Sequence, residues 1–344
     1  MEPHILELPR RVSVGKGVAD GIDRDLAVLE ISGRPLILVD GNTLKIAGER
    51  VAVALSALDP KTELVRESTM EEVERVMSCL EGFSCIISVG GGTVIDVGKV
   101  AAFRRRVPFI SVPTAPSHDG IASERASITD GSGKASIRAR PPLAVVADID
   151  VLMKAPKRLI AAGAADALSN LTSVQDWKLA RDDRKEYYSD YAAYLAKSSA
   201  KMILRSSKLI GKGEERGIRD LVEALLTSSI SMSLAGSSRP ASGAEHAFSH
   251  VLDSLGSKAL HGEQCGVGAI LTSCLQGRDW ELVRDTLKDV GAPTTARELG
   301  VTEDMVVEAL LKARDIRDRY TILNKKPLDR AKATELARRT GVTG

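Results

Sequence analysis

The chain has 344 residues, of which 43% are hydrophobic and 27% are charged, and its formal net charge is +2. This length favours two domains, and the composition is typical of a globular protein with ample material for a core. Aromatic residues make up only 3% of the chain, which argues against a surface that stacks the bases of single-stranded nucleic acid, and we expect no nucleic-acid partner.

The first half of the sequence alternates short apolar runs with segments of helical periodicity. The apolar runs predict strands at 12–15, 35–40, 62–65, 83–89, 107–112 and 143–149. Helices are predicted over 45–58, from a capping-box pattern at Ser68 and Glu71, and from Val94 onwards. Strands that are apolar on both faces and alternate with helices form parallel sheets. We therefore predict an α/β domain over residues 1–156.

The sequence changes character after Pro156. Long stretches rich in Ala and Ser have helical spacing and contain no convincing strand, and they are separated by Gly- and Pro-containing turns at 211–213, 237–240 and 291–293. We predict an all-α domain over residues 157–344. Because ligands of open α/β sheets bind beyond the carboxyl ends of the strands, we expect the active site between the two domains.

The four cysteines, Cys79, Cys85, Cys265 and Cys274, form no CxxC pair, so we expect reduced thiols of an intracellular protein. Cys265 is interpreted as a packed thiol, since nothing in the sequence argues for an activated thiolate.

The first residues form no signal peptide, and no apolar run approaches the roughly 18 residues that a membrane span requires. We expect a cytoplasmic protein without a membrane span.

A glycine-rich segment, Ser88–Lys99, joins the fourth predicted strand to the helix after it. Its three consecutive glycines, Gly90 to Gly92, remove Cβ atoms, permit a positive φ and let amide N–H groups approach an anion at the positive end of the helix. Such a segment fits a pyrophosphate. The alternative is a tight corner between strand and helix with no ligand.

Asp40 ends the second predicted strand, just before Gly41-Asn42-Thr43. Similar folds often place a carboxylate here against the 2′-hydroxyl of the adenosine ribose, which would favour NAD over NADP. The alternative is a turn aspartate that binds its own backbone. The sequence does not choose between the two cofactors.

Three of the five histidines fall in the predicted helical domain, at His246, His250 and His261. His246 and His250 are four residues apart and therefore share one helix face. Imidazoles together with a carboxylate are typical zinc ligands, and Asp166 offers a carboxylate within an Ala-rich stretch. The alternative is a pair of capping or surface histidines and an aspartate that merely begins a helix. The spacing alone does not decide between the two.

Four segments, 90–99, 112–120, 163–166 and 261–264, resemble in sequence and order the dehydroquinate-synthase-like, iron/polyol dehydrogenase superfamily. Within it, the segments Ser117-His118-Asp119-Gly120 and Arg319-Tyr320-Thr321-Ile322-Leu323 are similar to those of the sn-glycerol-1-phosphate dehydrogenase family, which supplies the glycerophosphate backbone of archaeal membrane lipids. The resemblance covers nearly the whole chain. It implies a Rossmann-like domain followed by a helical domain in a dehydroquinate synthase-like fold, and a homo-oligomer.

The resemblance also implies roles for individual residues. It places NAD(H) or NADP(H) on Gly90, Gly91, Gly92, Thr93, Val94, Ile95, Asp96, Thr114, Ala115, Pro116, Ser117 and Ser123. It implies that Asp166, His246 and His261 bind one catalytic Zn²⁺. Asp119, Asp166 and His250 would contact the substrate, with Asp119 and His250 as catalytic residues.

The implied reaction is the reversible, Zn²⁺-dependent reduction of dihydroxyacetone phosphate to sn-glycerol 1-phosphate. Zn²⁺ would act as a Lewis acid while the nicotinamide delivers hydride, and His250 or a water that it orients would transfer the proton. Asn170 stands where metal-dependent alcohol dehydrogenases of the superfamily usually carry a histidine, so those enzymes fit less well. The alternatives are a glycerol dehydrogenase, a dehydroquinate-synthase-like lyase and a non-catalytic nucleotide-binding regulator.

Overall fold

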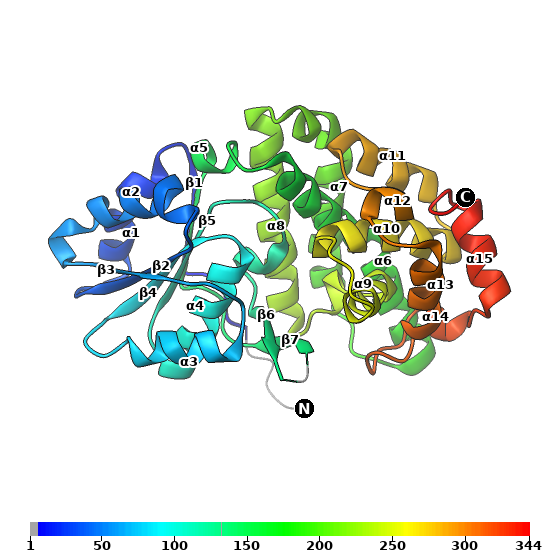
Figure 1. Cartoon of the computed structure of the whole chain (residues 1–344), viewed down its shortest axis with the longest axis horizontal. Helices are drawn as coiled ribbons and strands as arrows, with labels where there is room; N and C mark the ends of the chain where they lie inside the picture. The colour runs from blue at the N-terminus through cyan, green and yellow to red at the C-terminus, as the bar shows by residue number, and fades with distance from the viewer. Residues whose placement is uncertain (1–5, 132) are drawn as a thin grey trace. The chain divides into compact units, whose positions relative to one another are not determined.

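The computed structural model describes residues 6–131 and 133–344. Contacts within the chain divide it into two compact units, Met1–Pro156 and Lys157–Gly344 (Figure 1). We call them the N-terminal and the C-terminal unit. No helix in the described part of the chain is both long and apolar enough to cross a membrane.

The N-terminal unit is built on a six-stranded sheet in the order β1-β8-β5-β4-β2-β3. Every neighbouring pair in this sheet is parallel. The strands are β1 (Arg11–Gly15), β2 (Pro35–Val39), β3 (Lys61–Leu64), β4 (Cys85–Gly90), β5 (Phe109–Pro113) and β8 (Ala144–Asp148). The register sets Gly90 beside Pro113, so the segments that follow β4 and β5 leave the sheet at the same edge.

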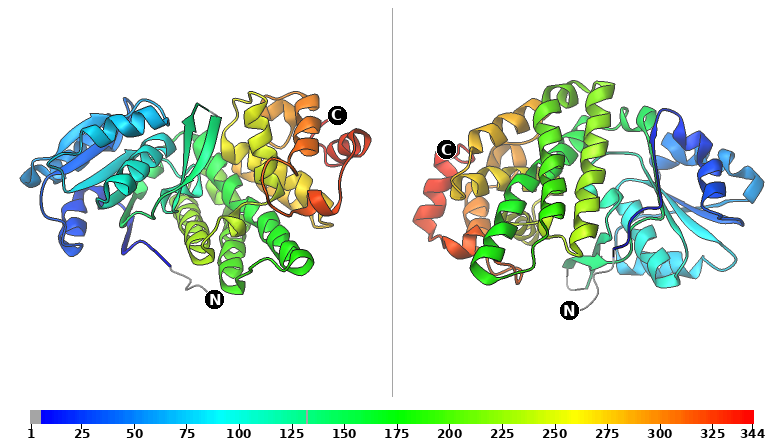
Figure 2. Two further views of the ribbon diagram at one scale, coloured as in Figure 1. Left: turned by 90° about the horizontal axis from the view of Figure 1, so that it is seen from below. Right: turned by 180° about the vertical axis from the view of Figure 1, so that it is seen from behind.

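Helices cover both faces of the sheet (Figures 1 and 2). Successive residues of a strand point to opposite faces. Ile37 and Val39 belong to the core that α1 and α2 complete, whereas Leu38 lies beside Gly98 of α4. The helical segments are η1 (Val18–Gly21), α1 (Ile22–Val28), η2 (Leu44–Gly48), α2 (Glu49–Ala54), η3 (Ser56–Leu58), α3 (Met70–Ser78), α4 (Gly92–Arg105), η4 (Asp119–Ile121) and α5 (Ile149–Leu152).

A two-stranded antiparallel hairpin, β6 (Arg125–Asp130) with β7 (Gly133–Arg138), was not expected from the sequence. It is anchored to the helices beside it by main-chain atoms. The N–H of Ser127 donates to Asp96 on α4, and the N–H of Thr129 donates to the carbonyl of Ser68 just before α3. These are tertiary contacts, which local propensity does not reveal.

The C-terminal unit, all of whose residues are described, contains only helices. The longest is α6 (Lys157–Arg184), and α7 (Asp190–Lys212) packs beside α8 (Glu215–Ala235) (Figure 2). The others are η5 (Arg239–Ala241), α9 (Ala244–Ser254), α10 (His261–Leu275), α11 (Trp280–Val290), α12 (Ala296–Leu299), α13 (Glu303–Lys312), α14 (Ile322–Lys325) and α15 (Arg330–Arg339). A parallel α/β unit followed by a helical unit confirms the predicted fold class.

Candidate functional site

Three helices of the C-terminal unit bring four candidate metal ligands together. Asp166 lies on α6, His246 on α9, and His261 and Cys265 on α10, and one ligand atom from each lies within 4.8 Å of the others. The Nε2 atoms of His246 and His261 are 3.6 and 3.9 Å from Asp166 Oδ1. Ligands bound at about 2.1 Å around a tetrahedral ion stand roughly 3.4 Å apart. The two histidines and the aspartate are thus close to the spacing that a single ion requires.

Small residues allow these helices to approach so closely. A Cβ added to Gly262, next to His261, would lie 2.0 Å from the carbonyl oxygen of Ala162 on α6. A Cβ added to Gly268 would lie 2.9 Å from the carbonyl oxygen of Glu245 on α9. The distance between packed helices depends on the side chains at the contact. The glycines of α10 therefore let its backbone rest on α6 and α9.

The ring of His246 is oriented by its neighbour Glu245, which is fully buried. The Nδ1 of His246 lies 3.0 Å from Glu245 Oε1. Burial would raise the pKa of Glu245, but hydrogen bonds from His246, Ser173 and Gly243 lower that pKa, which favours the ionised carboxylate. An ionised carboxylate only accepts, so Nδ1 donates to it, and Nε2, the atom that faces Asp166, is the nitrogen that a metal would bind.

The ring of His261 is oriented by hydrogen bonds that run through the neutral side chains of Ser249 and Gln264. The amide nitrogen of Gln264 donates to Asp253 Oδ1 (3.0 Å), so its oxygen accepts from the hydroxyl of Ser249 (2.6 Å). That hydroxyl has one hydrogen, so it accepts from His261 Nδ1, 3.1 Å away. Here too Nε2 is the nitrogen that remains for a metal. Two imidazole Nε2 atoms and a carboxylate oxygen at these distances from one another fit Zn²⁺.

Cys265 was not among the predicted ligands. Its sulfur lies 3.5 Å from His261 Nε2. Burial raises the pKa of its thiol to about 11, as is typical of a packed thiol rather than of an activated thiolate.

Two further predicted positions lie near the cluster. His250, half-buried, follows His246 by one turn of α9, and its ring centre is 6.0 Å from that of His261. Asn170 follows Asp166 by one turn of α6 and is fully buried, and its amide donates to Ser228 on α8 at 3.0 Å. Asn170 therefore joins α6 to α8.

In the N-terminal unit, the glycine-rich segment begins helix α4. Gly91 is its N-cap, without a capping side chain, and the first turn contains no acidic residue, so no carboxylate of that turn opposes an anion at the positive end of the helix. A Cβ at Gly91 would meet no atom within 4 Å. Its φ of −81° is one that any residue can adopt. Within the described part of the chain, neither packing nor backbone conformation requires a glycine at this position.

The expectation of a positive φ at these glycines was wrong. None of Gly90, Gly91 and Gly92 is among the described glycines with positive φ. Two of them are needed for packing instead. A Cβ at Gly90 would lie 2.5 Å from the Cβ of Val94, and one at Gly92 would lie 2.5 Å from His118 Nε2.

Asp96 and Lys99 anchor the surroundings of this segment. Asp96 Oδ2 accepts from the N–H of Ser127 at 2.8 Å. Lys99, which sequence analysis missed, is 1% exposed and donates to the carbonyls of Gly120 and Arg125 at 2.7 and 2.6 Å. A lysine on the apolar face of a helix is the signal that could have revealed it.

The second predicted cofactor segment follows β5. The N–H of Thr114 donates to the carbonyl of Gly90 at 3.0 Å, so this segment lies beside the start of α4. Thr114, Ala115, Pro116 and Ser123 are buried, while Ser117 and Asp119 are half-buried. Ser123 Oγ accepts from the N–H of Arg125 at 3.4 Å, and Asp119 begins η4.

Asp40 follows β2 and binds its own turn. Its Oδ1 accepts from the N–H groups of Asn42 and Thr43, both at 2.8 Å. The turn interpretation therefore accounts for one of its carboxylate oxygens.

The sequence matches the model of a family described as iron-containing alcohol dehydrogenase over residues 13–156. It is 49% identical to a glycerol-1-phosphate dehydrogenase [NAD(P)+] of Pyrococcus horikoshii, with 98% of this chain and 99% of the relative covered. It is 48% identical to one from Thermococcus kodakarensis, with 98% of each covered.

The fold is also similar to the crystal structure of glycerol dehydrogenase from Schizosaccharomyces pombe. The TM-score is 0.82 at 19% identity, with 99% of this chain and 91% of that chain covered. This likeness shows the shared fold. The two relatives at nearly half identity over the full length show the family, and the chain belongs to the glycerol-1-phosphate dehydrogenases.

Proposed function

We propose that this protein reduces dihydroxyacetone phosphate to sn-glycerol 1-phosphate with NADH or NADPH, reversibly, and that it requires Zn²⁺. The observation that carries the proposal is the meeting of Asp166, His246 and His261 in a chain of this family. We further propose that residues 1–156 form the cofactor domain and residues 157–344 the metal- and substrate-binding domain. By resemblance to its family, we propose a cytoplasmic homo-oligomer.

The cofactor is proposed to bind at the start of α4, where uncapped N–H groups offer donors to its pyrophosphate. Asp40 Oδ1 is occupied by its turn, so the other oxygen is proposed to meet the ribose. The predicted contacts are Gly90, Gly91, Gly92, Thr93, Val94, Ile95, Asp96, Thr114, Ala115, Pro116, Ser117 and Ser123.

When bound, the nicotinamide supplies hydride and Zn²⁺ supplies a Lewis acid. The protein contributes the candidate metal ligands and the proton. Asp166, His246 and His261 would hold the ion, and Glu245 and Ser249 orient the two imidazoles by binding their Nδ1 atoms. His250, beside the cluster, is proposed to hold the proton that the product hydroxyl needs, and Asp119 to orient the substrate.

The second candidate is glycerol dehydrogenase, which acts on the unphosphorylated compounds. It is favoured by structural neighbours of that name, at 22% and 19% identity, and such a likeness shows the fold alone. Relatives at 48–49% identity are named for the phosphorylated compound.

The test compares two ketones at equal concentration, dihydroxyacetone phosphate and dihydroxyacetone, by oxidation of NADH and of NADPH with Zn²⁺-loaded protein. A site built to bind a phosphate leaves charged or polar groups unpaired when the phosphate is missing. We expect kcat/KM to be at least about 100-fold higher for the phosphate ester. Equal or faster turnover of dihydroxyacetone would overturn the proposal in favour of glycerol dehydrogenase.

A further inference from the structure

A row of polar side chains continues from Asp166 along one face of α6. Positions three, seven and ten residues after Asp166 lie on nearly the same face of a helix. They are occupied by Ser169, Ser173 and Asp176, all of which are buried, with Thr172 beside them. The face that offers the candidate metal ligand thus also offers hydroxyls and a second carboxylate to the neighbouring helices.

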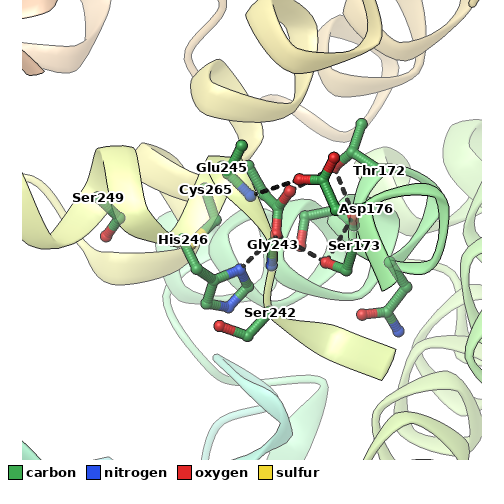
Figure 3. A network of polar contacts seen from close by, with 12 residues as sticks. Thr172, Ser173, Asp176, Ser242, Gly243, Glu245, His246, Ser249 and Cys265 are labelled. Carbon is green, nitrogen blue, oxygen red and sulfur yellow. Dashed lines mark hydrogen bonds and ion pairs between the residues drawn. The ribbon is translucent and has the colours of Figure 1, made fainter. Parts of the chain in front are cut away.

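Glu245 of α9 is bound to this row (Figure 3). Its Oε1 accepts from the hydroxyl of Ser173 at 2.7 Å, and its Oε2 accepts from the hydroxyl of Thr172 at 2.8 Å. The N–H of Gly243 also donates to Oε1, at 2.6 Å. With His246 as the fourth donor, at 3.0 Å, both carboxylate oxygens of Glu245 accept hydrogen bonds.

Asp176 holds the start of the same helix. Its Oδ2 accepts from the N–H of Ala244, the first residue of α9, at 2.8 Å. Its Oδ1 accepts from the side chain of Gln276 (2.9 Å) and from the N–H of Ile322, the first residue of α14 (3.0 Å). The N-terminus of α9 is therefore held on α6 through Ala244 as well as through Glu245 (Figure 3).

Packing α9 on α6 does not by itself require an ionised side chain at position 245. Placing a carboxylate fully out of water is costly unless several donors compensate it. The hydroxyls of Thr172 and Ser173 lie 2.8 and 3.3 Å from the carbonyl of Ser169, which can accept both of them. The group that gains a distinct property from Glu245 is the imidazole of His246, because a carboxylate partner fixes its tautomer and makes Nε2 a better ligand.

We propose that Glu245 is a positioning residue for His246, and that α6 is the common template which supplies Asp166 to the metal and holds Glu245 through Thr172 and Ser173. This inference rests on the metal site of the proposed function. It assigns to Glu245 a part in metal affinity and in the geometry of the ligand set.

The test measures metal binding by the full chain. The affinity for Zn²⁺ is obtained by competition with a chromophoric chelator. The geometry of the ligands is followed in the visible spectrum of the Co²⁺-loaded protein. Loss of such a partner weakens metal binding about 10–100-fold. We expect Glu245→Ala to weaken Zn²⁺ binding by about 100-fold and Glu245→Gln, which keeps an acceptor without the charge, by about tenfold. Both variants should change the Co²⁺ spectrum. If Glu245→Ala does not fold, Glu245→Gln still tests the role of Glu245 in metal binding.

The matched control is Asp148→Asn, which alters a carboxylate of the N-terminal unit that is 1% exposed and accepts from the N–H groups of Gly17, Ala19 and Asp150. This control should lower thermal stability but leave Zn²⁺ affinity and the Co²⁺ spectrum unchanged. Wild-type affinity and spectrum in Glu245→Gln would overturn the inference. Tight Zn²⁺ binding by the wild-type chain without reduction of dihydroxyacetone phosphate would instead overturn the proposed function alone, and a wild-type chain that binds no Zn²⁺ would overturn both.

Discussion

The two candidate histidine ligands turn the same atom toward Asp166 by different means. His246 donates Nδ1–H to the carboxylate of Glu245, whereas His261 donates to the hydroxyl of Ser249. A carboxylate partner raises the basicity of an imidazole more than a neutral hydroxyl does. We therefore expect His246 to be the stronger of the two ligands.

Gly91 allows a prediction about the cofactor at the scale of one residue. A methyl group there would meet no atom of the described chain within 4 Å, so Gly91→Ala should leave the unfolding temperature within a few degrees of the wild type. The same methyl group would occupy the space that we assign to a phosphate. Losing one charge-assisted hydrogen bond costs about 1.5–3 kcal/mol, so the KM for NADH should rise roughly 10–100-fold.

The control for this measurement is Gly21→Ala, since Gly21 also has open space around it and a negative φ, and lies outside the predicted site. It should leave both the KM and the unfolding temperature unchanged. A wild-type KM for NADH in Gly91→Ala would contradict the placement of the cofactor.

At the scale of elements, α10 connects stability to metal binding. Gly262→Ala would place a methyl group against the main chain of Ala162 on α6. Because the colliding atoms belong to the backbone, no side chain can rotate away to make room for it. Overpacking of this kind costs about 1–3 kcal/mol. It should also separate His261 from Asp166, so we expect a lower urea midpoint of the metal-free protein together with weaker Zn²⁺ binding. Gly21→Ala serves as the reference. If Gly262→Ala lowers the urea midpoint but leaves the Zn²⁺ affinity unchanged, the packing of α10 on α6 does not set the distance between His261 and Asp166.

Most elements of the sheet could be predicted from the sequence because their residues are apolar on both faces. The run predicted at 35–40 is β2 (Pro35–Val39), and the run at 83–89 is β4 (Cys85–Gly90). The N-cap of α3 was assigned one residue early. Thr69, not Ser68, accepts from the helix, at the N–H of Glu72. The hydroxyl of Ser68 instead donates to the carbonyl of Ser127, and no local pattern reveals a partner 59 residues away.

The candidate site, too, could be predicted from the sequence only where no contact between distant residues was needed. Asp166, His246 and His261 were recognisable as residue types that bind metal and by their resemblance to a family. Glu245 could not be assigned from its position beside His246, because its role depends on Thr172 and Ser173, some 70 residues earlier in the chain. Lys99 was missed for the same reason, since its two acceptors lie in η4 and β6.

At the scale of the whole molecule, the two units offer opposite charges to their ligands. The N-terminal unit presents the positive end of α4, which suits an anionic cofactor. The C-terminal unit gathers the carboxylate of Asp166 and the Nε2 atoms of two imidazoles, a set of ligands that suits a metal cation. Membership of the glycerol-1-phosphate dehydrogenases connects these two properties to one reaction.

The measurement that tests this account most directly is the zinc content of His246→Ala beside that of His250→Ala, with the rate of dihydroxyacetone phosphate reduction measured on the same samples. The two residues lie one turn apart on α9. We predict that His246→Ala loses both zinc and activity. His250→Ala should keep about one zinc per chain but reduce kcat by about 10²–10⁴-fold, because it removes only a proton donor. Full zinc content and activity in His246→Ala would contradict the assignment of the metal site.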